Sequence, residues 1–266
     1  MSQINVLDTA YEQLHEQIQT LHEQWYEQIG YECVVQTEGM SLDAPLAPQV
    51  VWNLKEEHYQ SFLQDLLRML AGTNNSIKDS LEKVQSLLTD ELLIRWFEEA
   101  IAVNNYYFQQ FAEENNVEPW LPFFLAEHAV RPFLQKASHE LGDILIRMDA
   151  HIGCPCCGEP ARLAIISKKG KKQLTCPRCS HSWQEKKICC AHCGTDEHEK
   201  VEILKIEGDE RAEIHVCLEC KGYTKVIDTR KLIGKAAPAL LDLRSIHLDY
   251  IAQEHGFGTL EGTDRH

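Results

Sequence analysis

Apolar residues near the start of the chain recur at the three- and four-residue steps of an amphipathic helix. Asp8 can cap this helix, Gly30 follows it, and Glu and Gln fill its other faces. So short a stripe favours the core face of a helix in a bundle, with a coiled coil as the alternative. Its apolar members are Leu7, Tyr11, Leu14, Ile18, Leu21 and Trp25.

The helical periodicity continues, with interruptions, to about residue 148. Gly72 interrupts the second pattern, and Thr89 or Asp90 is placed to cap a long helix that reaches Phe108. Residues 1–150 therefore predict an all-α bundle. After the first helix, the predicted helical segments cover residues 54–70, 76–88, 93–108 and 119–148.

After His151 the chain changes character, and short β-rich segments lie between pairs of cysteines. Residues 168–172 and 207–210 form the turns of two predicted hairpins. A helical pattern returns over residues 239–254, and Gly256 is placed to end it. The predicted strands cover residues 162–167, 173–175, 201–206 and 212–216.

These elements predict an α+β fold: an all-α bundle, then two zinc-ribbon or rubredoxin-like β modules, then a C-terminal helix. No apolar run approaches the length of a membrane span, and Met1 is not followed by a secretory signal, so we expect a cytoplasmic protein. The predicted domains are an acidic helical domain at 1–150, ribbons at 151–187 and 188–235, and a helix and tail at 236–266.

The negative charge is concentrated in the predicted helical domain. Residues 1–150 hold 8 Lys and Arg against 24 Asp and Glu, whereas the rest of the chain holds 18 against 17. An acidic surface of this size repels phosphate backbones, which argues against a nucleic-acid partner. It suits a solvated surface that contacts other proteins.

Ten of the eleven cysteines lie between Cys154 and Cys220, and only Cys33 lies outside this segment. In a compartment that keeps thiols reduced, such clustering favours metal ligation over disulfides. Four Cys-x-x-Cys turns, here called the first to fourth knuckles, each let two thiolates bind one ion. They are formed by Cys154 and Cys157, Cys176 and Cys179, Cys190 and Cys193, and Cys217 and Cys220.

The spacing of the knuckles favours pairing in chain order. Eighteen residues separate the first knuckle from the second, twenty-three separate the third from the fourth, and each gap contains a hairpin pattern. Only ten residues, without a turn signal, separate the second from the third. One ion is therefore predicted on Cys154, Cys157, Cys176 and Cys179, and another on Cys190, Cys193, Cys217 and Cys220.

Two further cysteines compete for these ligand positions. Only Cys157 and Cys190, rather than Cys156 and Cys189, give two-residue spacing with a glycine directly after the knuckle. We expect Cys156 and Cys189 to be packed or exposed thiols, and Cys33 to be a core cysteine.

Four thiolates per ion leave no open position for water or substrate, which predicts closed sites that are structural rather than catalytic. Zinc and a single rubredoxin-type iron both accept tetrahedral sulfur, so the metal stays open. The nearby His181, His192 and His215 are not needed as ligands. The sequence shows no catalytic triad, phosphate-binding glycine loop or His-Glu-x-x-His motif, and we expect no enzyme.

A helical first part, followed by Cys-Pro-x-Cys-Gly, Cys-x-x-Cys, Cys-x-x-Cys-Gly and Cys-x-x-Cys-x-Gly-Tyr-x-Lys, resembles the formate dehydrogenase accessory protein family, FdhE. Residues 248–257 also resemble the closing helix of that family, and residues 118–122 add a looser similarity. The matching residues are Cys154, Cys157, Gly158, Cys176, Cys179, Trp183, Cys190, Cys193, Gly194, Cys217, Cys220, Gly222, Tyr223 and Lys225.

The resemblance implies a cytoplasmic, non-enzymatic factor that binds the catalytic subunit of a molybdenum- or tungsten-dependent formate dehydrogenase and assists its maturation. It also implies rubredoxin-type iron in the cysteine sites. Two alternatives stay open: redox-active sites that pass electrons to this client or sense oxygen, and a nucleic-acid-binding zinc ribbon with a basic turn at 168–172. The client-binding surface and the oligomeric state, a homo-oligomer included, also stay open.

Overall fold

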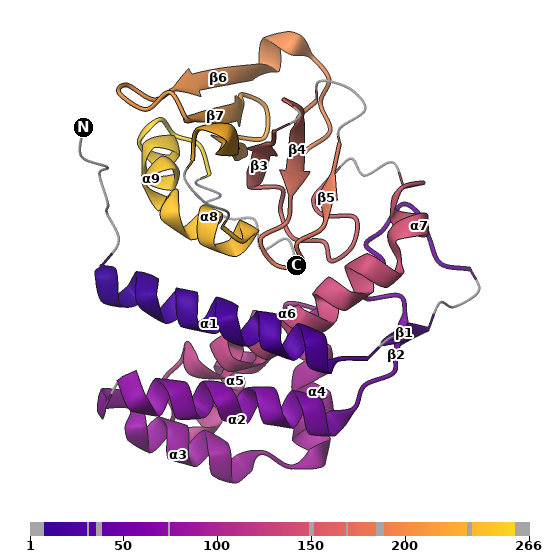
Figure 1. The fold of residues 1–266 in the computed structure, drawn as a ribbon, viewed down its shortest axis with the longest axis vertical. Helices are drawn as coiled ribbons and strands as arrows, with labels where there is room; N and C mark the ends of the chain where they lie inside the picture. Colours follow the sequence, from indigo (N-terminus) through magenta and orange to yellow (C-terminus); the bar gives the residue numbers. More distant parts are fainter. Residues whose placement is uncertain are drawn as a thin grey trace. The chain divides into compact units, whose positions relative to one another are not determined.

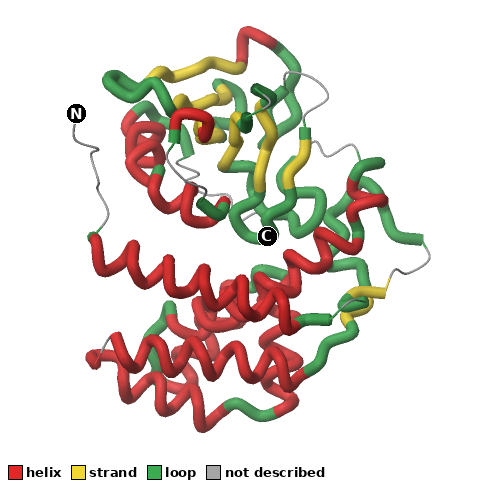
Figure 2. The backbone as a smooth tube through the Cα atoms, in the orientation of Figure 1, coloured by secondary structure: helices red, strands yellow, loops and turns green. Residues whose placement is uncertain are grey.

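The computed structural model describes residues 8–30, 32–35, 39–73, 75–148, 152–168, 170–184, 189–232 and 236–258. Leu7, Lys169 and the predicted tail beyond residue 258 lie outside these ranges. Within them the fold is α+β, as predicted, and Figure 2 separates a part rich in helix from a part that holds a sheet. The chain forms two compact units, the described parts of residues 20–40 and 47–140, and of residues 1–19, 41–46 and 141–265.

The helical unit is built around α6, on which α2, α4 and α5 pack (Figure 1). Aromatic side chains fill its core: the Trp25 and Phe62 rings stack at 4.7 Å, and Phe133 meets Phe97 edge to face at 5.3 Å. Helix α1, which both units share, begins where the Ala10 N–H donates to Asp8, the predicted cap. The helices are α1 (Thr9–Gln28), α2 (Glu56–Thr73), the 3₁₀ turn η1 (Asn75–Ile77), α3 (Lys78–Leu87), α4 (Asp90–Ile101), α5 (Asn105–Asn115) and α6 (Leu121–Glu140).

The prediction of one long helix up to Phe108 is wrong. Helix α4 starts at the predicted cap, where the Leu92 N–H donates to Thr89, but Val103 has a φ of 55° and ends it. Asn104 then accepts the Tyr107 N–H and so caps α5. The pattern over 119–148 is likewise divided, since α6 is followed by the short α7 (Gly142–Leu145).

The first 150 residues are also not purely helical. Strands β1 (Val34–Val35) and β2 (Val51–Trp52) form a short antiparallel pair. The N–H groups of Cys33 and Val34 both donate to the Glu140 carboxylate, each at 3.2 Å. These bonds hold the segment against the end of α6, and Cys33 is buried there, as predicted for a core cysteine.

The cysteine-rich segment forms one six-stranded sheet with the order β5-β4-β3-β8-β7-β6. Strands β3 to β5 and β6 to β8 are two antiparallel meanders, and β3 pairs in parallel with β8 to join them. The four predicted strands are confirmed, whereas β5 and β8, which follow the second and fourth knuckles, were not predicted. The strands are β3 (Leu163–Ile166), β4 (Lys172–Thr175), β5 (Ser182–Trp183), β6 (Val201–Lys205), β7 (Ala212–Cys217) and β8 (Tyr223–Asp228), with 3₁₀ turns η2 (His198–Lys200) and η3 (Thr229–Lys231).

The C-terminal helical pattern covers one face of this sheet. The predicted single helix is divided into α8 (Pro238–Arg244) and α9 (Ile246–Glu254) at Ser245, whose hydroxyl donates to the Leu241 carbonyl. Gly256, with a φ of 79°, follows α9 as predicted. The apolar cluster between sheet and helices contains Leu163, Ile214, Val216, Ile227, Leu241, Leu248, Ala252 and Phe257.

Among the described residues, no helix combines the length and the apolar character that crossing a bilayer requires. The division of the chain at residues 150, 187 and 235 stays a prediction.

Candidate metal centres

All four knuckles have the same backbone structure. In the first, the Cys154 N–H donates to the Glu159 carbonyl and the Gly158 N–H donates back to the Cys154 carbonyl, both at 2.8 Å. The same two hydrogen bonds recur in the other three knuckles at 2.8–3.0 Å. The residue after the second cysteine is left-handed in each, with φ values of 78° at Gly158, 59° at Ser180, 78° at Gly194 and 60° at Lys221. Glycine is therefore favoured at this position but not required.

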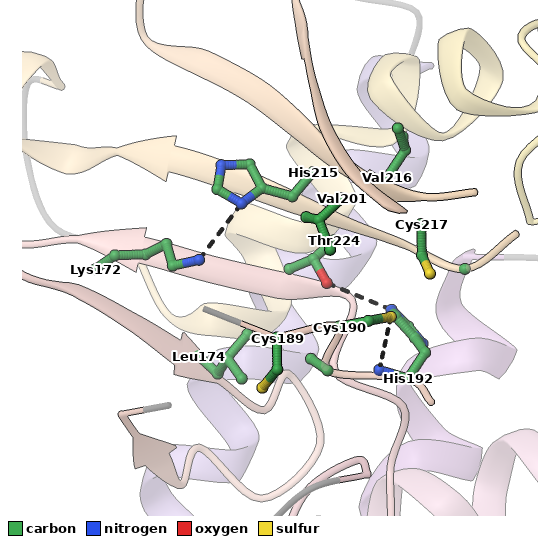
Figure 3. A pocket seen from close by; sticks show the side chains of 12 residues that line it. Lys172, Leu174, Cys189, Cys190, His192, Val201, His215, Val216, Cys217 and Thr224 are labelled. Carbon is green, nitrogen blue, oxygen red and sulfur yellow. Dashed lines mark hydrogen bonds between the residues drawn. The ribbon is translucent and has the colours of Figure 1, made fainter. Parts of the chain in front are cut away.

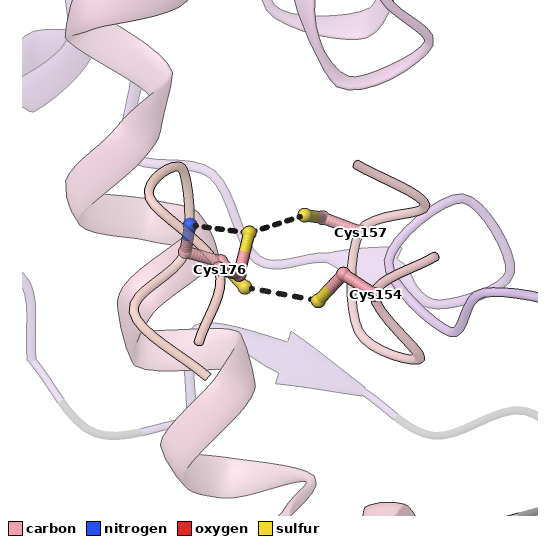
Figure 4. Close-up of side chains that lie close together, drawn as sticks. Cys154, Cys157 and Cys176 are labelled. Atoms are coloured by element: carbon pink, nitrogen blue, oxygen red, sulfur yellow. Dashed lines mark hydrogen bonds between the residues drawn. The ribbon is translucent and has the colours of Figure 1, made fainter. Parts of the chain in front are cut away.

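The first site brings together the sulfur atoms of Cys154, Cys157, Cys176 and Cys179. The Cys154 and Cys179 sulfurs lie 3.5 Å apart, and those of Cys157 and Cys176 lie 3.6 Å apart. Figure 4 shows Cys154 and Cys157 directed from one knuckle towards Cys176 on the other. All four cysteines are at most 5% exposed, so the site is closed to solvent.

The second site repeats this arrangement with Cys190, Cys193, Cys217 and Cys220. The Cys190 and Cys220 sulfurs are 3.7 Å apart, and those of Cys193 and Cys217 are 3.8 Å apart. In contrast to the first site, Cys193 and Cys220 are only partly buried. The structure thus groups the eight predicted ligands as the spacing predicts.

The sulfur positions fit a tetrahedral ion. A metal–sulfur bond of about 2.3 Å places the corners of a regular tetrahedron about 3.8 Å apart. The distances of 3.5–3.8 Å, with all four sulfurs of a group within 4.8 Å of one another, are close to this value. Zinc and rubredoxin-type iron would both be held by these thiolates, which leaves the identity of the metal undetermined.

Burial and hydrogen bonding shift the pKa values of the thiols of the first site in opposite directions. Burial raises the pKa of Cys154, Cys176 and Cys179 well above the usual range. Hydrogen bonds from the neighbouring thiols, aided by the charge of Arg178, hold the pKa of Cys157 well below it. Arg178 is only 1% exposed, so a buried guanidinium lies beside a group of thiolates that would carry an excess of negative charge around a divalent ion.

Backbone N–H groups act on the sulfurs of the second site. Burial raises the pKa of Cys220 to about 11, against the effect of the Gly222 N–H, which lies 3.3 Å from its sulfur. For Cys217 burial acts in the same direction, but the N–H groups of Cys220 and Glu219 outweigh it and lower the pKa. In the third knuckle, the His192 N–H donates to the Cys190 sulfur at 3.4 Å. These donors favour the thiolate form that a metal requires.

The second site also borders a pocket, shown in Figure 3. Cys190 and Cys217 line it together with Cys189, His192 and His215. Among the described residues, the side chains of Cys156 and Cys189 are outside both four-sulfur groups, in line with their prediction as non-ligands. Cys156 is fully buried next to Cys179, whose pKa it raises by a hydrogen bond.

The three nearby histidines have other partners than the metal groups. The His192 Nε2 lies 2.7 Å from the Tyr223 carbonyl, and the His215 Nε2 lies 2.8 Å from Glu213. His181 stacks on Trp183. Burial lowers the pKa of all three imidazoles.

A buried ionic cluster beside the second site was not predicted from the sequence. Lys225 is 1% exposed, and its Nζ lies 2.8 Å from Asp249 and 2.7 Å from Asp242. The Tyr223 hydroxyl donates to the other oxygen of Asp249 at 2.7 Å. Tyr223 and Lys225 stood out in the family-like motif, but only the fold shows that they bind acidic residues of α8 and α9.

No protein-family model matches the chain. A protein FdhE homolog of Aquifex aeolicus is 29% identical over 217 residues, which cover 78% of this chain and 71% of that protein. A Pseudomonas aeruginosa homolog is 29% identical over 55% of this chain and 54% of its own length. A Shewanella homolog (strain MR-4) is 33% identical over 40% of this chain and 35% of its own length.

The fold is also similar to a solved structure. The crystal structure of the FdhE protein from Pseudomonas aeruginosa matches with a TM-score of 0.62, covering 91% of this chain and 83% of that one at 19% sequence identity. At this identity the match supports the fold alone. Together with the sequence similarity to the homologs, it confirms the resemblance to the FdhE family predicted from the cysteine pattern.

Proposed function

We propose that this protein is an accessory factor for formate dehydrogenase, which acts in the cytoplasm by binding the catalytic subunit and assisting its maturation. The observation that carries the proposal is the pair of four-cysteine groups, built from knuckles in the order of the FdhE-like motif. We further propose that the factor is not an enzyme. Four thiolates around each ion leave no position for substrate, so binding rather than catalysis is the role that suits these sites.

The metal ligands of this proposal are the four cysteines of each site. Their thiolates lie at tetrahedral spacing, and backbone N–H groups point at Cys176, Cys190 and Cys220. A bound divalent or trivalent ion would cross-link two knuckles and so stabilise the sheet between them. Elemental analysis of the purified protein should find two ions per chain, and Cys190→Ser or Cys217→Ser should reduce this to one. Two ions in these variants would contradict the ligand assignment.

The experiment that tests the function is affinity capture of the tagged protein from its native host. We expect the formate dehydrogenase catalytic subunit among the enriched proteins, identified by mass spectrometry. Deletion of the gene should lower formate dehydrogenase activity while leaving the amount of catalytic-subunit polypeptide measurable. Absence of the subunit from the captured material, combined with full activity in the deletion strain, would sink the proposal.

The exposure of the second site favours a second candidate function, in which it transfers electrons to the client. The partly buried Cys193 and Cys220 bring thiolate sulfur towards the surface, where an electron could leave or enter a bound iron. The N–H groups that point at its sulfurs would stabilise the reduced iron–thiolate form. A reversible change in visible absorption on reduction would support this candidate. Colourless protein that contains only zinc would exclude it.

A further inference from the structure

The fourth knuckle is the place where the second metal site meets the C-terminal helices. Lys221, the left-handed residue of this knuckle, accepts the Gly258 N–H at 2.7 Å through its carbonyl. Gly258 follows α9 and lies so close to Tyr223 that a methyl group in its place would overlap the phenol ring. The end of the described chain therefore packs directly against the turn that carries Cys217 and Cys220.

Polar contacts extend this junction along β8. Tyr223 and Lys225 are two residues apart in the strand, so both side chains point to the same face of the sheet. On that face Tyr223 donates to Asp249 of α9, while Lys225 contacts Asp249 and both the carboxylate and the carbonyl of Asp242 in α8. These contacts exist only while the helices are docked. Without the helices, the Lys225 charge would lose both of its acidic partners, which is unfavourable.

Apolar packing completes the junction. Leu248, Ala252 and Phe257 on the helical side cover Ile214 and Val216 of β7, the strand that leads into Cys217. If the helices left the sheet, this apolar surface would face water. The first site reaches the C-terminal helices through a different residue, since Arg162 forms ion pairs with Glu159, which follows the first knuckle, and with Asp242 of α8. It therefore serves as a comparison for α9 and the residues after it, which contact the fourth knuckle and β8.

We propose that the ion of the second site orders the C-terminal helices: its binding docks α8 and α9 onto the sheet, and its loss releases them. The physical reason is that a bound ion would fix the backbone of the fourth knuckle. It would thereby hold the carbonyl of Lys221, whose backbone is left-handed, and the start of β8 in position. The inference rests on metal ligation by the second site and not on the identity of the client. Its consequence is a metal-dependent exposure of the apolar sheet face formed by Ile214, Val216 and Ile227.

Hydrogen exchange followed by mass spectrometry tests this proposal on the full chain. Cys193→Ser removes a ligand from the third knuckle without altering the fourth, and Cys157→Ser is the matched control at the first site. We expect amide exchange over residues 246–258 to quicken at least about tenfold in Cys193→Ser and to stay near the wild-type rate in Cys157→Ser. Equal exchange in Cys193→Ser and wild type, with the ion of the second site gone, would overturn the proposal.

The reverse direction provides a test in folded, metal-loaded protein. Because linkage is reciprocal, weakening the docked helices must weaken metal binding by the same factor. Tyr223→Phe keeps the ring but removes the hydrogen bond to Asp249, and Tyr250→Phe, at an exposed position of α9, is the control. Chelator competition should show about a fivefold or greater loss of affinity at the second site in Tyr223→Phe only.

The two possible failures are distinguishable. Unchanged affinity in Tyr223→Phe would refute the link between the helices and the site while leaving the ligands intact. A wild-type protein that binds only one ion, lost in Cys157→Ser, would refute the second site itself and the ordering that depends on it. Formate dehydrogenase activity enters neither readout.

Discussion

The two cysteine sites share one design but lie in different surroundings. Their knuckles have the same hydrogen bonds and left-handed exit, and their sulfurs are spaced at 3.5–3.6 Å in the first site and 3.7–3.8 Å in the second. Every cysteine of the first site is buried, whereas Cys193 and Cys220 of the second are partly exposed. The local sequence thus determines the turn, and the rest of the fold determines its access to water.

Charge separates the sites further. Arg178 is the third residue of the second knuckle and lies buried beside the first site. The equivalent residue of the fourth knuckle is Glu219, which is exposed and carries the opposite charge. Four thiolates and a divalent ion leave a net charge of about −2, so the buried guanidinium of Arg178 stabilises the first site, whereas the exposed Glu219 adds negative charge at the second. This difference predicts that the ion of the first site exchanges slowly and that the ion of the second site exchanges more readily.

The largest expected effect is the loss of a ligand from the buried site. Cys154→Ser should cost about 4 kcal/mol or more of unfolding free energy, because an ion that binds the folded state contributes its binding energy to stability. Cys193→Ser should cost clearly less, since solvent already reaches that corner of the second site. Urea denaturation of both variants and the wild type measures the difference. Equal losses would show that burial does not distinguish the two sites.

Removal of the buried charge should have the next largest effect. Arg178→Met keeps the length of the side chain but leaves the thiolates of the first site without their cation, at a cost of about 3 kcal/mol in metal binding. Glu219→Gln is the matched change at the second site, and because Glu219 is exposed it should shift binding only slightly. Chelator competition on both variants reads out the affinities. A larger change in metal affinity in Glu219→Gln than in Arg178→Met would contradict the inference that the Arg178 charge stabilises the first site.

Much of this arrangement could be predicted from the sequence because cysteine spacing and local turns are short-range features. The pairing of knuckles followed from counting residues between Cys157 and Cys176 and between Cys193 and Cys217. Four strands and the caps at Asp8 and Thr89 were predicted for the same reason. Local patterns also misled: the apolar periodicity continues through Val103 although its left-handed backbone divides the helix.

The features that the sequence did not reveal depend on long-range contacts. Strand β8 pairs with β3 across about 60 residues, so no local pattern indicates that the two modules form one sheet. Lys225 and Asp249 are 24 residues apart, and a lysine in a strand is ordinarily expected to be exposed. The burial of Arg178 likewise follows only from the folded chain, because its motif shows nothing beyond a residue between two cysteines.

Cys33 adds a third case to the comparison, since it is a buried thiol of the helical unit that belongs to neither four-cysteine group. Burial and the neighbouring Glu140 raise its pKa, so its folded pKa lies above that of the unfolded chain. Its contribution to stability is therefore complete below the unfolded pKa of about 8.5 and declines as the pH rises above it, by up to about 2 kcal/mol at pH 10. The contribution of metal-bound thiolates to stability has the opposite pH dependence, because protonation at low pH releases the ion.

Urea denaturation at pH 7.5 and pH 10 measures this effect of Cys33. The wild type should lose more stability between the two pH values than Cys33→Ala, which has no thiol to ionise in the unfolded state. The metal-loaded state of both proteins should in turn lose stability towards pH 5. An identical alkaline loss in Cys33→Ala would show that the thiol is not protected from ionisation by the fold.

The smallest expected effect is kinetic and bears on the exposure of the second site alone. With an excess of chelator at neutral pH, the two ions should leave in two phases, the faster from the second site by about tenfold, which corresponds to about 1.4 kcal/mol in barrier. Cys157→Ser should keep only the fast phase and Cys193→Ser only the slow one, because each variant retains a single site. Release in one phase from the wild type would mean that the partial exposure of Cys193 and Cys220 gives a chelator no better access than the closed first site. The contrast would then lie only in equilibrium affinity, through Arg178, and not in the rate of exchange.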